Sequence, residues 1–414
     1  MSLGSYNKKS LGMSLIYIVI FVVLFTIFGY ANFTLFYRQA HCNEFMVGDD
    51  ARYQSDIPDY IDVVKGVDTE FEFSYPLLFD FSNALTRFLS PEDAVAVAVL
   101  ILNMICIPVL TLFFKKSLVD DNNPISVIGS LIMPYVIMLV SMLWVPGGNE
   151  AYGLDFRYLG VFTPNPWHNQ TYFAARPFAI VAFLFFGRIL SYYEDSVNLK
   201  DYIVFSLFLV FSTMAKPSFT FVFISAAAVY ILIRLIFHKF ATLRNTLYLG
   251  ICFAPTIIVL AMQYLSTFSN EQSQVEEGIG FGFLRVWSMY SGNVTLSLVL
   301  VLVFPIIVLV FNFKLLFENR AYRFGWEFFL AGMLEFMFLT EEGDRLGHAN
   351  FSWGYMYGLF FVFLVSAWLL FKNTVSRKNH ISILLIQWLG LVLHFVAGSI
   401  YFVYLLQGGD FTQF

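Results

Sequence analysis

The sequence predicts an all-α, polytopic transmembrane helical bundle, and three observations lead to that prediction. Of the 414 residues, 58% are hydrophobic and only 13% are charged, whereas soluble domains carry about 25% charged residues. Phenylalanine alone accounts for 50 residues, and mean hydropathy is +0.71. Long apolar runs recur along the chain, and in a bilayer each must satisfy its backbone hydrogen bonds by forming a helix. We therefore expect residues 1–414 to form a single integral membrane domain.

Apolar windows bounded by polar stretches give about eleven predicted spans. The run 202–238 is too long for one span and is interrupted by Lys216-Pro217; because proline favours the first turn of a helix, two helices are predicted there. The predicted spans lie at 12–36, 93–114, 124–145, 173–193, 202–215, 217–238, 246–268, 291–313, 324–340, 353–371 and 381–405.

The distribution of lysine and arginine predicts the orientation. With the N-terminus in the cytoplasm, the cytoplasmic ends hold the larger set of basic residues, as the positive-inside rule requires. That set is Lys8, Lys9, Lys115, Lys116, Lys200, Arg234, Lys239, Arg244, Lys314, Arg320, Arg323, Lys372, Arg377 and Lys378. The outer loops that carry the polar chemistry are then 38–92, 146–172, 269–290 and 341–352. A bacterial plasma (inner) membrane is the expected location, with the functional site on its extracytoplasmic face.

The first outer loop contains an acidic segment. A helix over 49–57 would place Asp49, Tyr53 and Asp56 on one face, with Asp50 and Arg52 beside them. Pro58 would end this helix or open a second short amphipathic helix, with Ile61 and Val64 against the membrane surface. Grouped carboxylates just outside a membrane suit a general base or a divalent cation site, and the alternative is a solvated acidic loop.

Glu72 lies between two phenylalanines in the same loop. Partial desolvation at the bilayer edge would raise the pKa of this carboxylate and suit it to proton transfer. An exposed glutamate between two aromatic side chains that dip into the membrane is the other interpretation.

The second long loop ends in a polar, aromatic segment that includes Trp167, His168 and Asn169. Aromatic rings stack on the C–H faces of sugars while amides bind hydroxyls, so the segment predicts a sugar platform. An interfacial aromatic belt is the simpler alternative.

Lys216 lies between two apolar helices, where a cation is costly and indicates a functional site. Next to the free amides of a helix N-terminus, it suits a phosphate, unless its ammonium only reaches back to the interface.

The densest polar cluster covers 341–353. Arg345 and His348 are three residues apart and could present two donors to a phosphate, with Asn350 beside them. An exposed turn is the alternative.

The Asp-Asp-x-Arg-Tyr motif at 49–53, in a large outer loop after one N-terminal span, resembles the GT-C superfamily of membrane glycosyltransferases. The closest pattern is that of the lipid A aminoarabinose transferase group, whose Phe-Glu-Lys-Pro segment resembles 71–76. Here Phe73 stands where the family has lysine, so Lys216 or Arg345 is expected to supply the phosphate contact.

The resemblance implies a polyprenyl-phosphate-linked sugar donor and a glycan or lipid-linked acceptor in the cell envelope. Asp49 would deprotonate the acceptor hydroxyl, supported by Asp50 or Glu72, and the sugar would be transferred with inversion. If a divalent cation takes part, Asp49 and Asp50 would hold it; no other cofactor is implied.

Two rival functions remain at this stage. A polysaccharide polymerase or ligase acting on lipid-diphosphate glycans would also have about a dozen spans, but such enzymes tend to rely on outer-loop arginines. A lipid-linked sugar flippase or transporter should place polar groups near mid-membrane, whereas ionisable residues here gather at one face. Nothing in the sequence indicates nucleic-acid binding.

Overall fold

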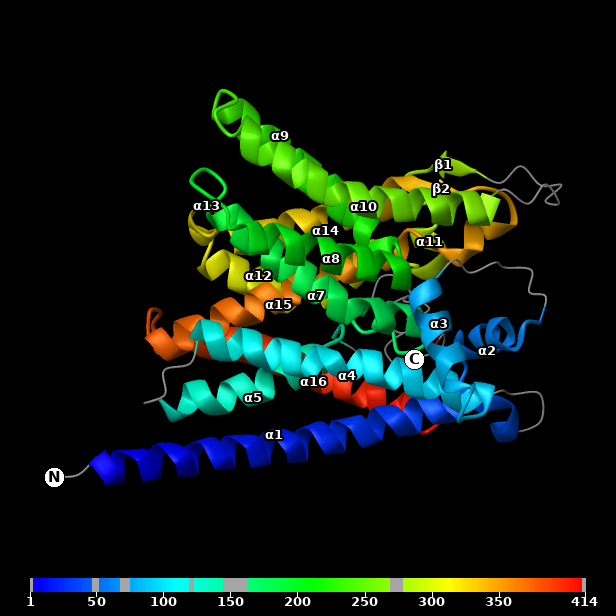
Figure 1. Ribbon diagram of the computed structural model, residues 1–414, viewed down its shortest axis with the longest axis horizontal. Helices are drawn as coiled ribbons and strands as arrows, with labels where there is room; N and C mark the ends of the chain where they lie inside the picture. The colour runs from blue at the N-terminus through cyan, green and yellow to red at the C-terminus, as the bar shows by residue number, and fades with distance from the viewer. Residues whose placement is uncertain are drawn as a thin grey trace.

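The computed structural model describes residues 3–46, 52–67, 75–118, 123–143, 163–268 and 278–411. Within these residues the chain is almost entirely helical, and each of the eleven predicted spans corresponds to one long helix (Figure 1). The long helices are α1 (Leu3–Ala40), α4 (Pro91–Leu118), α5 (Pro124–Leu139), α7 (Gln170–Ser191), α8 (Leu199–Ala215), α9 (Ser218–Phe237), α10 (Leu243–Phe268), α12 (Val294–Phe311), α14 (Arg320–Phe338), α15 (Ser352–Ser376) and α16 (Ile381–Leu406).

Short elements connect the long helices. The first predicted outer loop contributes a 3-10 turn and two short helices, and an antiparallel pair of three-residue strands joins two later segments with Gly280 opposite Thr340. These elements are η1 (Cys42–Phe45), α2 (Ile57–Lys65), α3 (Pro76–Leu85), β1 (Ile279–Phe281), α11 (Trp287–Tyr290), α13 (Leu315–Glu318), β2 (Leu339–Glu341) and η2 (Gly343–His348).

Eight of the long helices in the described structure are long and apolar enough to cross a membrane: α1, α4, α7, α9, α10, α12, α15 and α16. The other three fall short for different reasons. Helices α5 and α8 have only 16 and 17 residues, and α14 includes Arg320, Arg323, Glu327 and Glu335. The described structure is thus nearly all-α and has the apolar helices of a membrane protein, with eight helices long and apolar enough to cross against about eleven predicted crossings.

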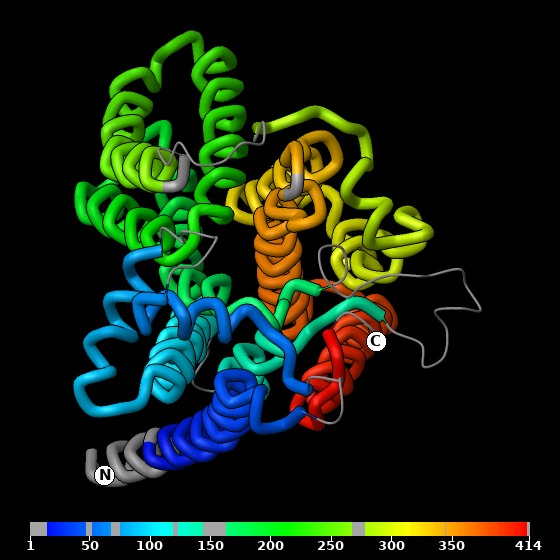
Figure 2. Tube along the Cα trace, turned by 90° about the vertical axis from the view of Figure 1, so that its right-hand side faces the viewer, coloured from blue at the N-terminus to red at the C-terminus, as the bar shows by residue number. Residues whose placement is uncertain are grey.

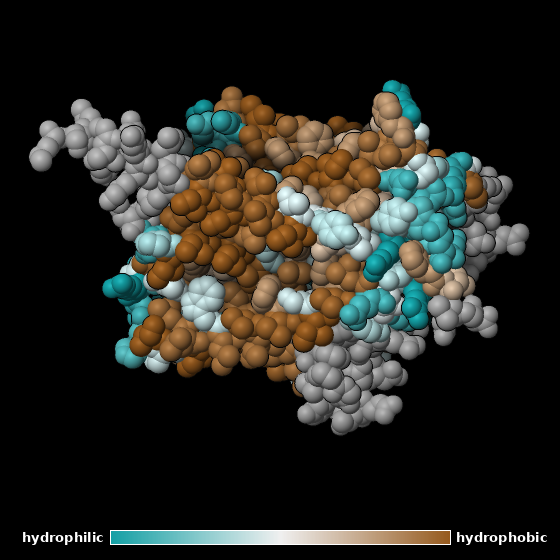
Figure 3. All heavy atoms as spheres, turned by 90° about the horizontal axis from the view of Figure 1, so that it is seen from below, coloured by the Kyte–Doolittle hydropathy of each residue, from teal (hydrophilic) through white to brown (hydrophobic). Residues whose placement is uncertain are grey.

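The long helices run roughly along one axis, and the loops gather at two opposite ends (Figure 1). One end carries η1, α2, α3, β1, β2 and η2, and we call it the α2–α3 end; the N-terminus lies at the other end. Apolar side chains cover the middle of the surface in Figure 3, and hydrophilic side chains gather most densely at the α2–α3 end. This distribution is the one expected for a bundle surrounded by lipid.

The predicted break at Lys216-Pro217 is confirmed. Helix α8 ends at Ala215, Lys216 is extended, and α9 begins at Ser218. The chain reverses here, so that the turn lies at the α2–α3 end with α8 and α9 side by side (Figure 1).

Helix α15 forms the centre of the bundle (Figure 2). Of its most apolar window, 94% is buried inside the protein, compared with 11% for α1. Glycines allow α14 to pack closely on it: a Cβ on Gly332 would lie 2.9 Å from the Gly354 carbonyl oxygen, and one on Gly358 would lie 2.9 Å from the Phe329 Cα. Small residues spaced four apart, here Gly354 and Gly358, are typical of close helix pairs in membranes.

Candidate functional site

All three predicted catalytic residues, Asp49, Asp50 and Glu72, lie outside the described residues. The chain on either side of them is described, and it places the first outer loop at the α2–α3 end (Figure 1). Their roles therefore stay predictions, and the site is built from the remaining candidates.

The expected helix over 49–57 is wrong across 52–56. Tyr53 has a left-handed backbone (φ 59°), which a right-handed helix cannot contain. Asp56 occupies the N-cap position of the helix that starts at Ile57, without a capping hydrogen bond from its side chain. The second helix predicted from Pro58 is confirmed as α2. Ile61 is 4% exposed and packs in the protein core instead of against the membrane surface.

Arg52 and Tyr53 both lie beside Gly408 but differ in exposure. Arg52 is exposed, whereas Tyr53 is buried against Phe45, with ring centroids 5.1 Å apart. The Tyr53 hydroxyl accepts a hydrogen bond from Arg38 Nη1 at 3.2 Å. Tyr53 therefore fixes the loop to the end of α1.

Asp56 meets the second outer loop through Asn169. The Asn169 side-chain amide donates to Asp56 Oδ2 at 2.5 Å and to the Tyr60 hydroxyl at 3.3 Å. Asn169 Oδ1 also caps α7 by accepting from the Tyr172 amide, which fixes the orientation of the side chain. The backbone supports the same contact, because the Asp56 amide donates to the His168 carbonyl oxygen at 2.9 Å. The structure thus joins two loops that the sequence treated separately.

Lys216 joins the same network from the α8–α9 turn. Its ammonium donates to Thr171 Oγ1 at 3.0 Å, and Thr171 Oγ1 lies 3.2 Å from the Tyr60 hydroxyl. The ammonium also lies 4.7 Å from the centre of the Trp353 ring and 5.4 Å from that of Tyr75. We call Asp56, Tyr60, Asn169, Thr171 and Lys216 the polar cluster.

The Lys216 ammonium is almost fully buried, at 4% exposed. In the described part of the chain, no carboxylate lies within 4.0 Å of it, and Asp56 acts on it only at longer range. A buried cation normally has a close anionic partner. This one is held by a neutral hydroxyl and two aromatic rings.

Burial shifts the two ionisable groups of the cluster toward neutrality. Desolvation raises the pKa of Asp56 to about 6, although the positive charge of Lys216 and the Asn169 hydrogen bond oppose the rise. Desolvation lowers the pKa of Lys216 to about 8, opposed by the charge of Asp56. A carboxylate and an amine that both titrate near neutral pH are typical of functional sites.

His168 lies beside the polar cluster and is 2% exposed. Its ring stacks on Phe411 with centroids 4.0 Å apart and planes 4° apart, and Trp353 lies 5.6 Å away. Neither ring nitrogen has a hydrogen-bond partner among the described residues. Desolvation and the charge of Lys216 lower the pKa of His168 to about 3, so the imidazole is neutral at physiological pH.

Trp167 is fully buried and offers no open face to a sugar. Its ring packs between Phe173 and Phe402, with centroids 4.8 and 4.6 Å away, and its carbonyl oxygen accepts from Gln39. The indole packs inside the bundle among α1, α7 and α16, so the burial of its apolar surface is enough to explain why a tryptophan stands here. His168 and Asn169 are also only 2% exposed. The sugar platform therefore stays a prediction, in which the sugar would meet His168 and Asn169 rather than the Trp167 ring.

Arg176 anchors the segment that carries these residues. Its guanidinium is fully buried in α7 and donates to Asn165 Oδ1 at 2.5 Å and to Asn103 Oδ1 at 2.7 Å. Phe173 and Phe360 lie 4.4 and 5.1 Å from it. This support was not foreseen as part of the site, although an arginine inside an apolar window is a signal for it.

The cluster at 341–353 forms η2 and the start of α15 at the same end of the bundle. Asn350 donates to Glu341 Oε2 at 2.7 Å, and both His348 and Asn350 are exposed. Arg345 lies close enough to act electrostatically on Tyr75, whose pKa burial raises to about 12. Arg345 thus approaches the polar cluster through the same tyrosine that faces Lys216.

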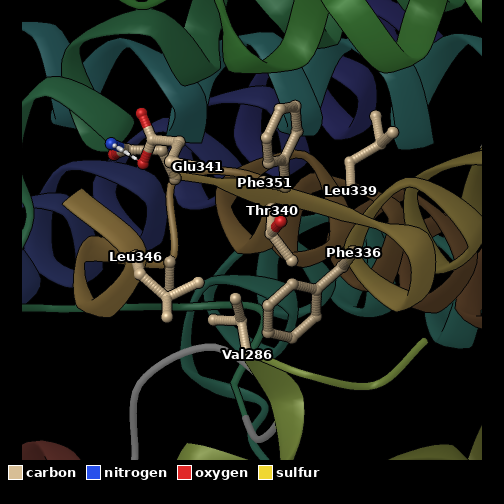
Figure 4. A pocket seen from close by; sticks show the side chains of 9 residues that line it. Val286, Phe336, Leu339, Thr340, Glu341, Leu346 and Phe351 are labelled. Carbon is tan, nitrogen blue, oxygen red and sulfur yellow. Dashed lines mark hydrogen bonds between the residues drawn. The ribbon is translucent and has the colours of Figure 1, made fainter. Parts of the chain in front are cut away.

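A small hollow lies behind Glu341 (Figure 4). Val286, Phe336 and Leu346 line it together with Thr340, and the Glu341 carboxylate turns to Asn350. Its lining is mostly apolar and supplies no reactive group beyond those already described.

Chemically, the arrangement offers a carboxylate, a buried cation and several neutral donors within one connected network. No group of three or more histidine, cysteine, aspartate or glutamate side chains in the described chain is placed to hold a metal ion. Asp49 and Asp50, the residues predicted for a cation, lie outside the described part of the chain. Tyr60, Thr171 and Phe411 are members of the site that sequence reasoning missed. The chain matches no protein-family model, and no curated protein or solved structure is significantly similar to it.

Proposed function

We propose that this protein is an inverting membrane glycosyltransferase that moves a sugar from a polyprenyl-phosphate-linked donor to a cell-envelope glycan or lipid-linked acceptor. The observation that supports this most is the convergence of the half-buried Asp56 and the buried Lys216 in one network at the end of a membrane bundle. A carboxylate and a cation at this position suit a reaction whose leaving group is a lipid phosphate.

In the proposed reaction, the acceptor hydroxyl oxygen forms a bond to the anomeric carbon while the bond from that carbon to the phosphate oxygen breaks. The hydroxyl proton passes to a carboxylate, for which we propose Asp49, with Asp50 or Glu72 in support. The departing phosphate takes up the bonding electrons, and the configuration at the anomeric carbon inverts.

Lys216 is the proposed phosphate ligand. Its ammonium is desolvated and has a hydroxyl and two aromatic rings as neighbours, so an incoming phosphate would gain a strong charge-assisted hydrogen bond. Arg345, which acts on the same Tyr75, is the proposed second cation. Asp56 keeps Lys216 protonated at neutral pH by raising its pKa.

The sugar of the donor is proposed to meet His168 and Asn169, with Arg52, Tyr53, His348 and Asn350 at the edge of the site. A neutral imidazole donates and accepts hydrogen bonds to hydroxyls without attracting a second phosphate. We also propose that the chain crosses the membrane eleven times, with the N-terminus in the cytoplasm and the α2–α3 end outside the cell.

A transporter is a weaker alternative on these observations. Lys216 lies at a helix turn at the end of the bundle (Figure 1), and not at a midpoint between two openings, where transporters bind their substrates.

The deciding experiment measures sugar transfer from polyprenyl-phosphate donors by the full chain in detergent. Asp49→Asn should abolish turnover while donor binding, measured separately, persists, because only the proton acceptor is removed. Lys216→Met should weaken donor binding instead. Normal transfer by Asp49→Asn would exclude that residue as the base, and absence of transfer by the wild-type chain with every polyprenyl-phosphate sugar tried would contradict the proposed function.

A further inference from the structure

The β1 strand carries an apolar surface that the polar cluster does not use. Residues 278–283 read Gly-Ile-Gly-Phe-Gly-Phe. Alternation along β1 places Ile279 and Phe281 on one face and Gly280 on the other. Phe283 follows in a turn, and its ring lies against Phe338 as that of Phe281 does. Ile279, Phe281 and Phe283 are 72%, 75% and 61% exposed. We call these three side chains the apolar ladder.

The glycine face of the strand is covered by a charged pair. A Cβ on Gly280 would collide with the Glu342 carboxylate, and one on Gly282 would lie 3.0 Å from the Arg285 Cβ. Glu342 and Arg285 form an ion pair at 3.5 Å. The segment therefore separates a charged face from an apolar one, as a membrane-surface element does.

The apolar ladder continues a stripe on α14. Phe338, the last residue of α14, stacks on Phe281 with ring centroids 5.3 Å apart and lies 5.3 Å from Phe283. One and two turns earlier on the same helix face, Leu334 and Leu330 are 49% and 44% exposed. One apolar surface therefore runs from these leucines through Phe338 to the apolar ladder.

The length of α14 indicates how deep in the bilayer the apolar ladder lies. Its 19 residues extend over about 28 Å, close to the roughly 30 Å hydrocarbon thickness of a bilayer. α14 is one of the eleven proposed crossings, although its four charged residues keep it out of the eight most apolar helices. In that crossing, Phe338 lies at the hydrocarbon boundary and the apolar ladder lies in the interfacial layer, which is about 5–7 Å thick on each side.

We propose that Ile279, Phe281 and Phe283 form a bilayer anchor that seats the α2–α3 end in the interfacial layer of one leaflet. The partner is the lipid surface, because the ladder is continuous with the exposed apolar stripe of α14 and its charged pair faces the other way. This inference rests on the proposed crossing of α14 but not on the transfer chemistry.

The experiment places nitroxide spin labels on single cysteines of the full chain in lipid nanodiscs. A Cys252→Ser background leaves two native cysteines, Cys42 and Cys106, which are both buried. Labels at Ile279→Cys, Phe281→Cys and Phe283→Cys are compared with Ile258→Cys, on the exposed face of α10, and with Asn83→Cys, an exposed polar position on α3. Relaxation by oxygen, which concentrates in lipid, and by a water-soluble nickel complex reports the depth of each label.

The proposal predicts that ladder labels relax strongly with oxygen and weakly with nickel, with depths between those of Ile258→Cys and Asn83→Cys. Nickel accessibility at all three ladder positions equal to that of Asn83→Cys would overturn it, and so would spin–spin broadening between molecules, which would indicate a second copy on this surface. Three ladder positions keep the test decisive if one variant fails to assemble. As a further readout, serine at both Phe281 and Phe283 should lower the thermal stability in nanodiscs more than in detergent, whereas leucine at both should not.

Discussion

At the residue scale, the polar cluster depends on two groups that oppose each other across one hydrogen-bond network. Asp56 is held by Asn169, and Lys216 is held by Thr171. Burial disfavours the charged form of each group, and the opposite charge of its partner favours that form. The pair is therefore sensitive to pH in the neutral range, which neither group would be in water.

This coupling predicts how transfer depends on pH on the alkaline side. Lys216 has a lowered pKa of about 8 and is protonated only below it, and the negative charge of Asp56 opposes that lowering. Activity should therefore fall through about pH 8 as Lys216 loses its proton. Asp56→Asn should shift this alkaline limb to lower pH, because Lys216 loses the charge that supports its protonation. An unchanged alkaline limb in Asp56→Asn would contradict the coupling.

A second residue-scale prediction concerns how much Lys216 contributes to the affinity for the polyprenyl-phosphate donor. Hydrogen bonds to charged groups contribute about 1.5–3 kcal/mol, so Lys216→Met should weaken the binding of a polyprenyl-phosphate donor roughly ten- to hundred-fold. Isothermal titration in detergent measures this. Lys372→Met at the N-terminal end of the bundle, a lysine that lies over the Trp368 ring, is the matched control and should bind the donor like the wild-type chain.

At the element scale, the sequence predicts the helices well and their polar contacts poorly. Apolar runs fix where a helix must form in lipid, and asparagines at 169, 198, 293 and 319 cap α7, α8, α12 and α14. The left-handed Tyr53 could not be foreseen, because it depends on tertiary contacts with Arg38 and Phe45. Likewise, Thr171 reads as an ordinary helix residue in the sequence. Its role in the polar cluster depends on the turn between α8 and α9, which places Lys216 beside its hydroxyl. The sequence therefore indicated which residues are polar and out of place, but not which of them meet.

The packing of α14 on α15 gives an element-scale prediction. Gly358→Ala would place a methyl group 2.9 Å from the Phe329 Cα, which forces the two helices apart and should destabilise the protein by about 1–3 kcal/mol. Gly250→Ala on α10 meets nothing within 4 Å and should leave stability equal or slightly higher, since alanine favours helix. Thermal unfolding in one detergent compares the two variants, and equal stability would contradict the close packing.

At the scale of the whole molecule, the proposed orientation places the α2–α3 end outside the cell. In a Cys252→Ser background, a membrane-impermeant maleimide added to intact cells should label Asn83→Cys but not Asp195→Cys, which is exposed at the opposite end. Permeabilised cells should show labelling at both positions. The reverse pattern in intact cells would place the polar cluster in the cytoplasm and exclude an extracytoplasmic acceptor.

The parallel stack of His168 and Phe411 also has a spectroscopic consequence for the whole molecule. Two aromatic rings at 4.0 Å with parallel planes shift each other's proton resonances upfield through their ring currents. The chain has six histidines, and His41 also lies near a ring, 4.4 Å from that of Tyr37. The upfield signal of His168 in histidine-labelled protein is therefore assigned by its loss in His168→Gln. Its chemical shift is then a native reporter of whether residues 407–411 stay on the site when a donor is added.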